Sequence, residues 1–420
     1  MTFDGLSAAE IQALHSEQLQ AYERLKDAGL SLDLTRGKPS AEQLDLSSDL
    51  LTLPGEHRAA DGTDTRNYGG LTGLLDLREM FAELLHVPVS QLLAGDNASL
   101  ALMHDTLVFA LLLGTPDSPQ PWSREEKVTF ICPVPGYDRH FALLEQYGID
   151  MVNVDMLADG PDMVAVRELV TDPTVKGIWI VPTYSNPTGA TVSEAVAAEL
   201  AAMDTAAPDF RIYWDNAYAL HHLTEERTKS ADILGLCSAS GNPNRPLLFA
   251  STSKITFAGA GVSFLAGSPD NVDWYLKYIA KRTIGPDKVN HLRHARYLGD
   301  ANGVVELMDR HRAILAPKFE AVLEVLRSRL GPYGVASWTE PTGGYFVSLD
   351  VVDGTAARVV QLAKDVGVAL TPAGASFPYG KDPNDRNIRL APSFPSIEDV
   401  KASMDCVATC VLLAATELHV

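Results

Sequence analysis

The 420-residue sequence predicts an α/β protein of two domains, the larger one built on a mostly parallel sheet. Three observations support this. The length fits two or three domains with a large core. From about residue 65 to 295, short apolar runs alternate with helical patterns, which is typical of a parallel sheet covered on both faces. Several of these runs end in polar residues, as expected at the carboxyl edge of a sheet, where open α/β folds bind ligands.

The N-terminal segment predicts a helix followed by a short strand. The helix spans Leu6 to Leu30, with Ser7 and Glu10 forming a capping box and Gly29 as the stop. Residues 32–39 then predict a strand that ends in a turn.

The rest of the chain continues the alternation and ends in helices. A strongly apolar helical pattern covers residues 100–113, and a long one from about Val304 to Leu330 could bridge two domains before Gly331-Pro332 ends it. The elements predicted after it are a strand at 345–349, a helix near 355–366, a strand at 387–390 and a closing helix from Ser396, with Asp399 completing its capping box, to about Glu417.

Three of the apolar runs lead into chemically distinctive residues. These are Ser185-Asn186-Pro187-Thr188-Gly189 after residues 177–181, Asp215-Asn216-Ala217-Tyr218 after 211–214, and Ser251-Thr252-Ser253-Lys254 after 246–250. Alone, each has an ordinary explanation as a solvated lysine, a helix cap or a turn. Together they place an amine, a carboxylate, a phenol and an amide at one sheet edge. This set suits pyridoxal phosphate, which needs a lysine for its aldehyde, an acid for its ring nitrogen and donors for its ring oxygen.

The order of these motifs, preceded by a tyrosine and a glycine at Tyr68 and Gly73, resembles the aspartate aminotransferase superfamily of pyridoxal phosphate enzymes (fold type I). The resemblance runs from about Leu34 to the C-terminus. The sequence of residues 135–140, Pro-Gly-Tyr-Asp-Arg-His, resembles a divergent bacterial subgroup of aspartate aminotransferases.

The resemblance implies a fold, a domain division and an assembly. The large domain would hold a mostly parallel seven-stranded sheet sandwiched by helices and span residues 46–300. Residues 1–45 and 301–420 would together build a small α+β domain. The protein would be a homodimer with its sites at the subunit interface.

The resemblance also assigns roles around the cofactor ring. Lys254 would bond to the cofactor and then move a proton as general base and acid, which requires burial to lower the pKa of its amine. Asp215 would hold the ring nitrogen protonated. Tyr218 and Asn186 would bind the ring oxygen, and Tyr137 would stack on the ring.

For the phosphate, the expected donors are backbone amides and hydroxyls. Ala98 and Ser99 precede the apolar helix at 100–113, and a helix N-terminus favours anions. Ser251 and Ser253 would add hydroxyls, and Tyr68 would reach the phosphate of the neighbouring subunit.

The sequence departs from the family where an arginine usually follows the lysine to pair with the phosphate. Residues 258–263 read Ala-Gly-Ala-Gly-Val-Ser and contain no cation. Either hydroxyls and amides suffice, or Lys288, Arg282 or Arg36 substitutes.

Substrate recognition is expected to depend on Arg389, which matches the family arginine that grips the α-carboxylate in a bidentate pair. Gly37 would let the backbone approach the same carboxylate, with Asn186 and Arg36 nearby. A second cation for an acidic side chain is left open among Arg36, Lys38, Arg139 and Arg293.

The expected activity is that of a pyridoxal-phosphate-dependent aminotransferase in amino-acid metabolism, moving the amino group of L-aspartate to 2-oxoglutarate through a pyridoxal phosphate/pyridoxamine phosphate ping-pong cycle. Alternatives are another donor (aromatic, alanine or 2-aminoadipate), a pyridoxal-phosphate-dependent lyase, and a pyridoxal-phosphate-binding sensor. The sensor hypothesis is weakened because the roughly 30 residues before the family region lack the basic character of a DNA-binding domain.

Other functional classes find little support in the sequence. The net charge of -20 argues against nucleic-acid partners. Gly259-Ala260-Gly261 lacks the third glycine of a dinucleotide-binding motif because Phe264 stands there. His221, His222, His291 and His294 form no metal-binding motif, and Gly-x-Ser-x-Gly is absent.

The expected location is the cytoplasm, with small amino acids and 2-oxo acids as partners. The chain shows no basic leader and no apolar stretch of about 18 residues, so neither a signal peptide nor a membrane partner is expected. Its four cysteines show neither CxxC pairs nor the density of a disulfide-rich domain, which fits a reducing compartment.

Overall fold

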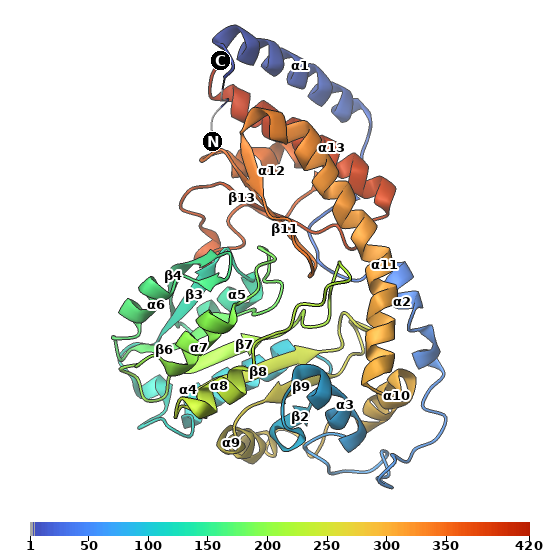
Figure 1. The fold of residues 1–420 in the computed structure, drawn as a ribbon, viewed down its shortest axis with the longest axis vertical. Helices are drawn as coiled ribbons and strands as arrows, with labels where there is room; N and C mark the ends of the chain where they lie inside the picture. The colour runs from blue at the N-terminus through green and yellow to red at the C-terminus, as the bar shows by residue number, and fades with distance from the viewer. Residues whose placement is uncertain (1–2, 4) are drawn as a thin grey trace.

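A large twisted sheet organises the lower part of the molecule (Figure 1). The computed structural model describes residues 3 and 5–420, and within them this sheet has eight strands in the order β2-β9-β8-β7-β6-β3-β4-β5. The strands are β2 (Leu92–Ala94), β3 (Thr129–Val134), β4 (Asp150–Leu157), β5 (Gly160–Pro161), β6 (Val175–Ile180), β7 (Arg211–Asp215), β8 (Pro246–Ser251) and β9 (Ser263–Ala266).

The direction of these strands confirms the predicted fold class. Strands β8, β7, β6, β3 and β4 run parallel to one another, and β9 runs antiparallel to both β8 and β2. Seven strands form the predicted mostly parallel sheet, and the two-residue β5 adds an antiparallel pairing at the far end of β4.

Successive side chains of the central strands point to opposite faces of the sheet, as the period of two requires. On β7, Ile212 and Trp214 join one apolar core, whereas Tyr213 joins the core on the other face. On β6, Ile178 and Trp179 divide in the same way. Every residue of these two strands is buried, which explains why they appear in the sequence as continuous apolar runs.

Helices cover both faces of this sheet. The face that carries Trp214 is covered by α3 (Leu75–Leu85), α6 (Met163–Leu169), α7 (Glu194–Ala202), α8 (Ile233–Ala239) and α10 (Lys288–Leu298). The face that carries Tyr213 is covered by α4 (Ser99–Leu113), α5 (Asp138–Gln146) and α9 (Pro269–Ile279). Within the described residues, no helix combines the length and apolar character needed to cross a bilayer.

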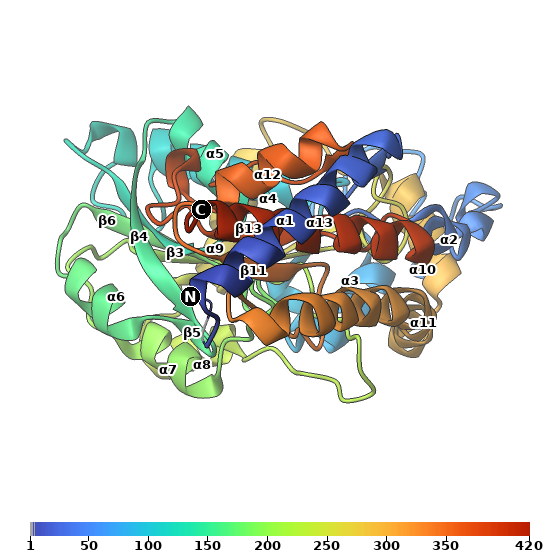
Figure 2. The ribbon, with the colours of Figure 1, turned by 90° about the horizontal axis from the view of Figure 1, so that it is seen from above.

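The upper part of the molecule is built from both ends of the chain (Figures 1 and 2). Its strands are β10 (Ala336–Trp338), β11 (Val347–Val351) and β13 (Asn387–Leu390), which form an antiparallel sheet, and β1 (Leu32–Asp33) and β12 (Val368–Ala369), which pair in parallel. Its helices are α1 (Ala8–Asp27), α12 (Ala356–Asp365) and α13 (Ile397–Glu417), and α2 (Ala41–Asp45) leads from it toward the large sheet.

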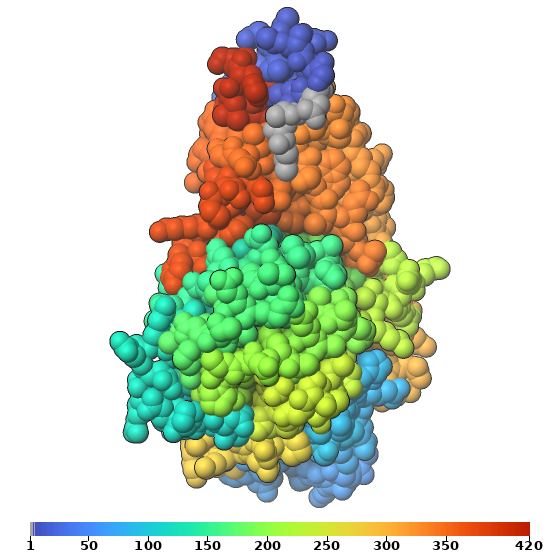
Figure 3. All heavy atoms as spheres, turned by 60° about the vertical axis from the view of Figure 1, so that its left-hand side comes forward, coloured from blue at the N-terminus to red at the C-terminus, as the bar shows by residue number. Residues whose placement is uncertain are grey.

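The first and last helices pack against each other. His15 Nδ1 on α1 lies 3.0 Å from Thr416 Oγ1 on α13, and the Tyr22 hydroxyl donates to the Leu362 carbonyl at 3.1 Å. In the space-filling view, the N-terminal helix and the C-terminal residues gather at one end of the molecule (Figure 3). The proposed boundaries between residues 46–300 and the two flanking segments stay a prediction.

Helix α11 (Ala301–Val325) contributes to the cores of both parts. Its Leu307 packs with residues of the large sheet, and its Phe319 packs with residues of α13 and β11. Asp300 caps its start through a hydrogen bond from the Gly303 amide, and the helical path continues through a π-turn at 326–330. The predicted helix at 304–330 is therefore confirmed, beginning three residues earlier at Ala301, and it contributes to both cores.

Most element boundaries agree with the sequence, with small differences. The capping box of Ser7 and Glu10 is present in both directions, at 3.3 and 2.8 Å. At α13, Ser396 accepts from the Asp399 amide. The strand expected at 345–349 instead covers Val347–Val351, because the chain bends at Tyr345 before the strand begins. Short helical turns lie at 48–51, 89–91, 122–124, 331–333 and 378–380.

Candidate active site

The three predicted motifs follow strands that lie side by side in the large sheet. Asp215 is the last residue of β7, Lys254 follows the end of β8, and Asn186 lies in the loop after β6. Since β6, β7 and β8 are adjacent and parallel, their carboxyl ends meet at one edge. The alternation along β7 puts Asp215 on the same face as Tyr213, which is the face covered by α4 and α5.

Asp215 is buried and bonded through only one carboxylate oxygen. His140, on α5, donates from Nε2 to Asp215 Oδ2 at 3.0 Å, and its ring stacks on Trp179 with centroids 4.3 Å apart. Asp215 Oδ1 is also buried but has no hydrogen-bond partner in the described part of the chain. A buried unpaired carboxylate oxygen calls for a donor. A protonated ring nitrogen is such a donor, so this oxygen fits the cofactor that the motifs suggest.

Lys254 lies beside two buried phenols. Its Nζ is 4.9 Å from the centroid of the Tyr218 ring and 6.0 Å from that of Tyr345. Burial lowers the pKa of the Lys254 amine, and the Asp215 carboxylate partly opposes this shift. A lowered pKa leaves a larger fraction of the amine unprotonated near neutral pH, and only the unprotonated amine can act as nucleophile or base.

The two tyrosines predicted to contact the cofactor ring, Tyr218 and Tyr137, remain protonated. Burial raises the pKa of Tyr218 well above its ordinary value, and it raises the pKa of Tyr137 to about 12. Tyr137 directly precedes α5, and its ring meets His140 edge-on with centroids 4.9 Å apart. Both phenols can therefore donate hydrogen bonds.

The N-terminus of α4 lies next to the end of β8. Ala98 is the residue that caps α4 and Ser99 is its first residue. In the sheet, Ser251 pairs with Ser263, whose amide donates to the Asp96 carbonyl at 2.7 Å. Ser251 Oγ also donates to Ser253 Oγ at 3.1 Å. The structure thus brings the predicted phosphate donors from both segments to one place.

The three candidate cations for the phosphate lie in different surroundings. Arg282 approaches the α4 N-terminus, where it pairs with Asp105 at 3.1 Å and Asp96 at 3.5 Å. Lys288 donates to the Gly69 carbonyl at 2.6 Å. Arg36 is exposed on the segment before Gly37.

Tyr68 is not gathered into the site of its own chain. Its side chain is 82% exposed. Its predicted contribution is to the site of a second subunit.

Arg389, on β13, reaches the site from the upper part of the molecule. It is 7% exposed, its Nη1 donates to Asp138 Oδ1 at 2.8 Å and to Asn186 Oδ1 at 3.4 Å, and its guanidinium lies 5.0 Å from the Phe346 ring centroid. A Cβ added at Gly37 would overlap the Phe346 ring, so the glycine is required for this packing.

The four candidates for a side-chain clamp are not equivalent. Lys38 places its ammonium 3.8 Å from the Phe394 ring centroid. Arg293 is engaged by the Leu53 carbonyl at 3.0 Å and by Asn290 Oδ1 at 3.4 Å. Arg36 and Arg139 are exposed, and the choice between candidates stays open.

A buried polar chain, not foreseen from the sequence, supports the turn that carries Lys254. Gln43 on α2 donates to the Tyr345 hydroxyl and to His311 Nδ1, both at 3.0 Å. His311 on α11 donates in turn to the Ile255 carbonyl at 2.9 Å. All of these side chains are fully or almost fully buried.

His140 and Asp138 are the other residues that sequence reasoning missed. Their signal is their spacing from Tyr137. Asp138 follows it directly and His140 lies three positions later, which is about one helical turn at the start of α5.

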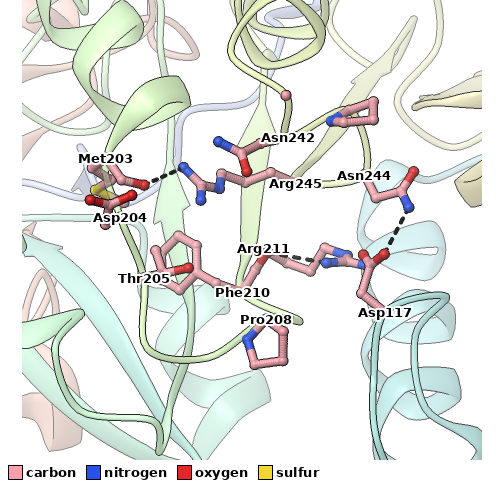
Figure 4. Close-up of a pocket in the computed structure, with 12 residues that line it drawn as sticks. Asp117, Met203, Asp204, Thr205, Pro208, Phe210, Arg211, Asn242, Asn244 and Arg245 are labelled. Atoms are coloured by element: carbon pink, nitrogen blue, oxygen red, sulfur yellow. Dashed lines mark hydrogen bonds and ion pairs between the residues drawn. The ribbon is translucent and has the colours of Figure 1, made fainter.

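A cavity of about 300 Å³ lies away from these residues, at the opposite edge of the sheet (Figure 4). Arg211, which begins β7, pairs there with Asp117 at 2.6 Å. Arg245 donates from Nη1 to the carbonyls of Leu200, Ala201 and Met203 at the end of α7. These arginines therefore hold the protein's own groups. A larger cavity of about 430 Å³ lies beside the Asn186 loop, lined in part by Thr188 and Ser348.

Comparisons with known proteins agree along the whole length. A family model described as aspartate amino-transferase matches residues 6–420. An aspartate aminotransferase from Corynebacterium glutamicum is 58% identical, with 99% of this chain and 97% of that protein covered. The crystal structure of an aspartate transaminase from the same organism superposes with a TM-score of 0.98 at 57% identity, covering 100% of both chains.

A more distant structure shares the fold. This is the α-aminoadipate aminotransferase LysN from Thermus thermophilus, in complex with N-(5'-phosphopyridoxyl)-L-leucine. It superposes with a TM-score of 0.74 at 21% identity, covering 99% of this chain and 100% of that one.

Proposed function

The chain belongs to the aspartate amino-transferase family and is an aminotransferase, and from this membership we propose that it transfers the amino group of L-aspartate to 2-oxoglutarate with pyridoxal phosphate as its cofactor. The observation that carries the cofactor proposal is Asp215 Oδ1, which is buried and has no hydrogen-bond partner among the described residues, close to a lysine of lowered pKa. The choice of aspartate rests on the name of the 58% identical relative.

The residues proposed to hold the cofactor surround this carboxylate. Asp215 would accept the hydrogen of the ring nitrogen, Tyr218 and Asn186 would bind the ring oxygen, and Tyr137 would cover the ring. The residues proposed for the phosphate are Ala98 and Ser99 at the α4 N-terminus, the hydroxyls of Ser251 and Ser253, and Tyr68 from a second subunit. When bound, pyridoxal phosphate supplies an aldehyde that bonds to amines and a cationic ring that withdraws electrons from the substrate Cα.

The chain's own groups would position the substrate and move one proton. Arg389 would bind the α-carboxylate and so fix the substrate Cα relative to the Lys254 amine. Lys254 would take the proton from Cα and return it at the other end of the transfer, acting first as base and then as acid. His140 would hold Asp215 correctly oriented by donating a hydrogen bond to its Oδ2.

The wider setting is part of the same proposal. The reaction would release its first product before the second substrate binds. The enzyme would act as a homodimer in the cytoplasm, with residues 46–300 as the large domain. The strong exposure of Tyr68 supports the homodimer, because this side chain is free to reach a second subunit. The four cysteines support the cytoplasm, because in the described part of the chain all of them are buried and none forms a disulfide.

The test uses the visible absorbance of the purified protein loaded with pyridoxal phosphate. Adding L-aspartate without a 2-oxo acid should shift the cofactor band, because the amino group moves to the cofactor and stays there. Lys254→Ala should abolish this shift and lower turnover by at least about 10²- to 10⁴-fold, since it removes both the covalent anchor and the base.

The control is Lys281→Ala, which removes an exposed lysine and should change neither readout. If the absorbance band does not change with aspartate but shifts with another amino acid, that amino acid replaces aspartate as the proposed donor. A Lys254→Ala protein with full turnover would refute the assignment of the lysine.

A further inference from the structure

The arginine proposed to bind the substrate carboxylate already holds a carboxylate of its own chain. Arg389 Nη1 donates to Asp138 Oδ1 at 2.8 Å. Asp138 is the first residue of helix α5, which covers the large sheet, and Arg389 lies on β13, so the pair connects the two parts of the molecule. The family resemblance assigned no role to Asp138.

The hydrogen bonds of Arg389 use only one part of its guanidinium. Nη1 serves both Asp138 and Asn186, the latter at 3.4 Å. Nε is buried and has no hydrogen-bond partner in the described part of the chain. The guanidinium therefore keeps donor capacity for another acceptor, as a planar group with five donors allows.

The two partners differ in how much they can move. The side chain of Arg389 is 8% exposed, whereas that of Asp138 is 35% exposed. Arg389 is also packed over the Phe346 ring at 5.0 Å and cannot turn to solvent without leaving this contact. Asp138 can rotate into water from the start of its helix, so the aspartate is the partner that can leave.

Two carboxylates cannot bind to one guanidinium nitrogen without repelling each other. A buried guanidinium without any counter-ion is costly, and Asp138 removes that cost in the substrate-free chain. A second carboxylate on the free donors of the same guanidinium would also lie within a few ångströms of Asp138, in surroundings where like charges interact strongly.

We propose that Asp138 is an internal counter-ion of Arg389 that the α-carboxylate of the substrate displaces. The exchange keeps the charge around Arg389 constant, since one carboxylate replaces another. It also makes Asp138 a specificity-determining residue, because an amine without a carboxylate cannot take its place. This inference rests on the proposed function, in which Arg389 binds the substrate.

The first test measures the Kd of succinate, an unreactive dicarboxylate, by calorimetry on the holoenzyme. Asp138→Asn keeps the shape of the side chain and suits a helix start. Without the competing charge, succinate should bind about tenfold more tightly, and the KM values of aspartate and 2-oxoglutarate should fall alike with little change in kcat. Asp138→Glu should restore values near those of the wild type.

Two further variants distinguish a wrong role for Arg389 from a wrong role for Asp138. Glu145→Gln removes an exposed charge from the same helix and should leave succinate binding unchanged. Arg389→Lys should weaken succinate binding. If Arg389→Lys has no effect, the proposed role of the arginine is wrong.

If Arg389→Lys weakens binding but Asp138→Asn leaves it equal or weaker, Asp138 stays in place during binding and the displacement is refuted. Asp138→Ser, measured in the same way, provides the result should the asparagine variant fail to fold.

Discussion

Asp215 shows how much of the site follows from single residues and how much does not. Its place at the end of β7, and those of Lys254 and Asn186 after neighbouring strands, could be predicted, because parallel strands end at one edge and side chains alternate along them. Its partner His140 could not. Which residues of α5 face the sheet depends on how that helix is rotated and packed, and this is a long-range property that the local sequence does not encode.

Gln43 offers a test of the buried polar chain at the level of one side chain. Gln43→Leu should lower the free energy of unfolding by about 1–3 kcal/mol, because the Tyr345 hydroxyl and His311 Nδ1 would lose their common donor while remaining buried. Urea denaturation measures this change. Gln12→Leu, at an exposed position of α1, is the matched control. Equal effects of the two substitutions on the free energy of unfolding would show that the hydrogen bonds of the buried polar chain add no stability.

At the scale of elements, the long helices and buried strands were predictable and the irregular ends were not. Helical periodicity marked α1, α11 and α13, capping residues marked the starts of α1 and α13, and Gly331-Pro332 marked the end of the path that begins with α11. The strand β11 begins two residues later than its apolar pattern suggested, because Tyr345 contacts Gln43 and Phe346 contacts Arg389 at the site. The two-residue β5 had no sequence signal of its own.

Helix α11 should couple the unfolding of both parts. Leu307→Ala removes contacts with the large sheet and Phe319→Ala removes contacts with α13, each costing about 2–5 kcal/mol. Because one continuous helix carries both residues, each variant should lower the midpoint of a single urea transition. Tryptophan fluorescence and far-UV circular dichroism should give the same midpoint. Two separate transitions would show that the helix does not link the two cores.

At the scale of the whole molecule, buried histidines should govern stability in mild acid. Burial lowers the pKa of five of them, to about 4 for His222 and His294; the others are His221, His291 and His311. In the unfolded chain a histidine has a pKa of about 6.5. Between these values the unfolded chain binds more protons than the folded one, so stability falls as the pH falls.

For His222 and His294 the predicted loss begins near pH 6.5 and levels off near pH 4, with each of the two contributing up to about 1.4 kcal/mol per pH unit. Urea titrations at several pH values across this window measure the slope. His294→Gln should make the dependence of the free energy of unfolding on pH less steep by the contribution of one histidine, since it removes one of the five groups. A stability that is constant across this range would contradict the prediction.

The pairing of α1 with α13 has a consequence for how the molecule is made. A ribosome delivers α1 before the strands of the large sheet and α13 after them, and domains tend to fold as they emerge. The apolar side of α1 therefore stays without its partner α13 while the residues between the two helices are translated. The large sheet can assemble before α13 is made, but the part of the molecule that carries Arg389 is complete only after α13 has packed against α1.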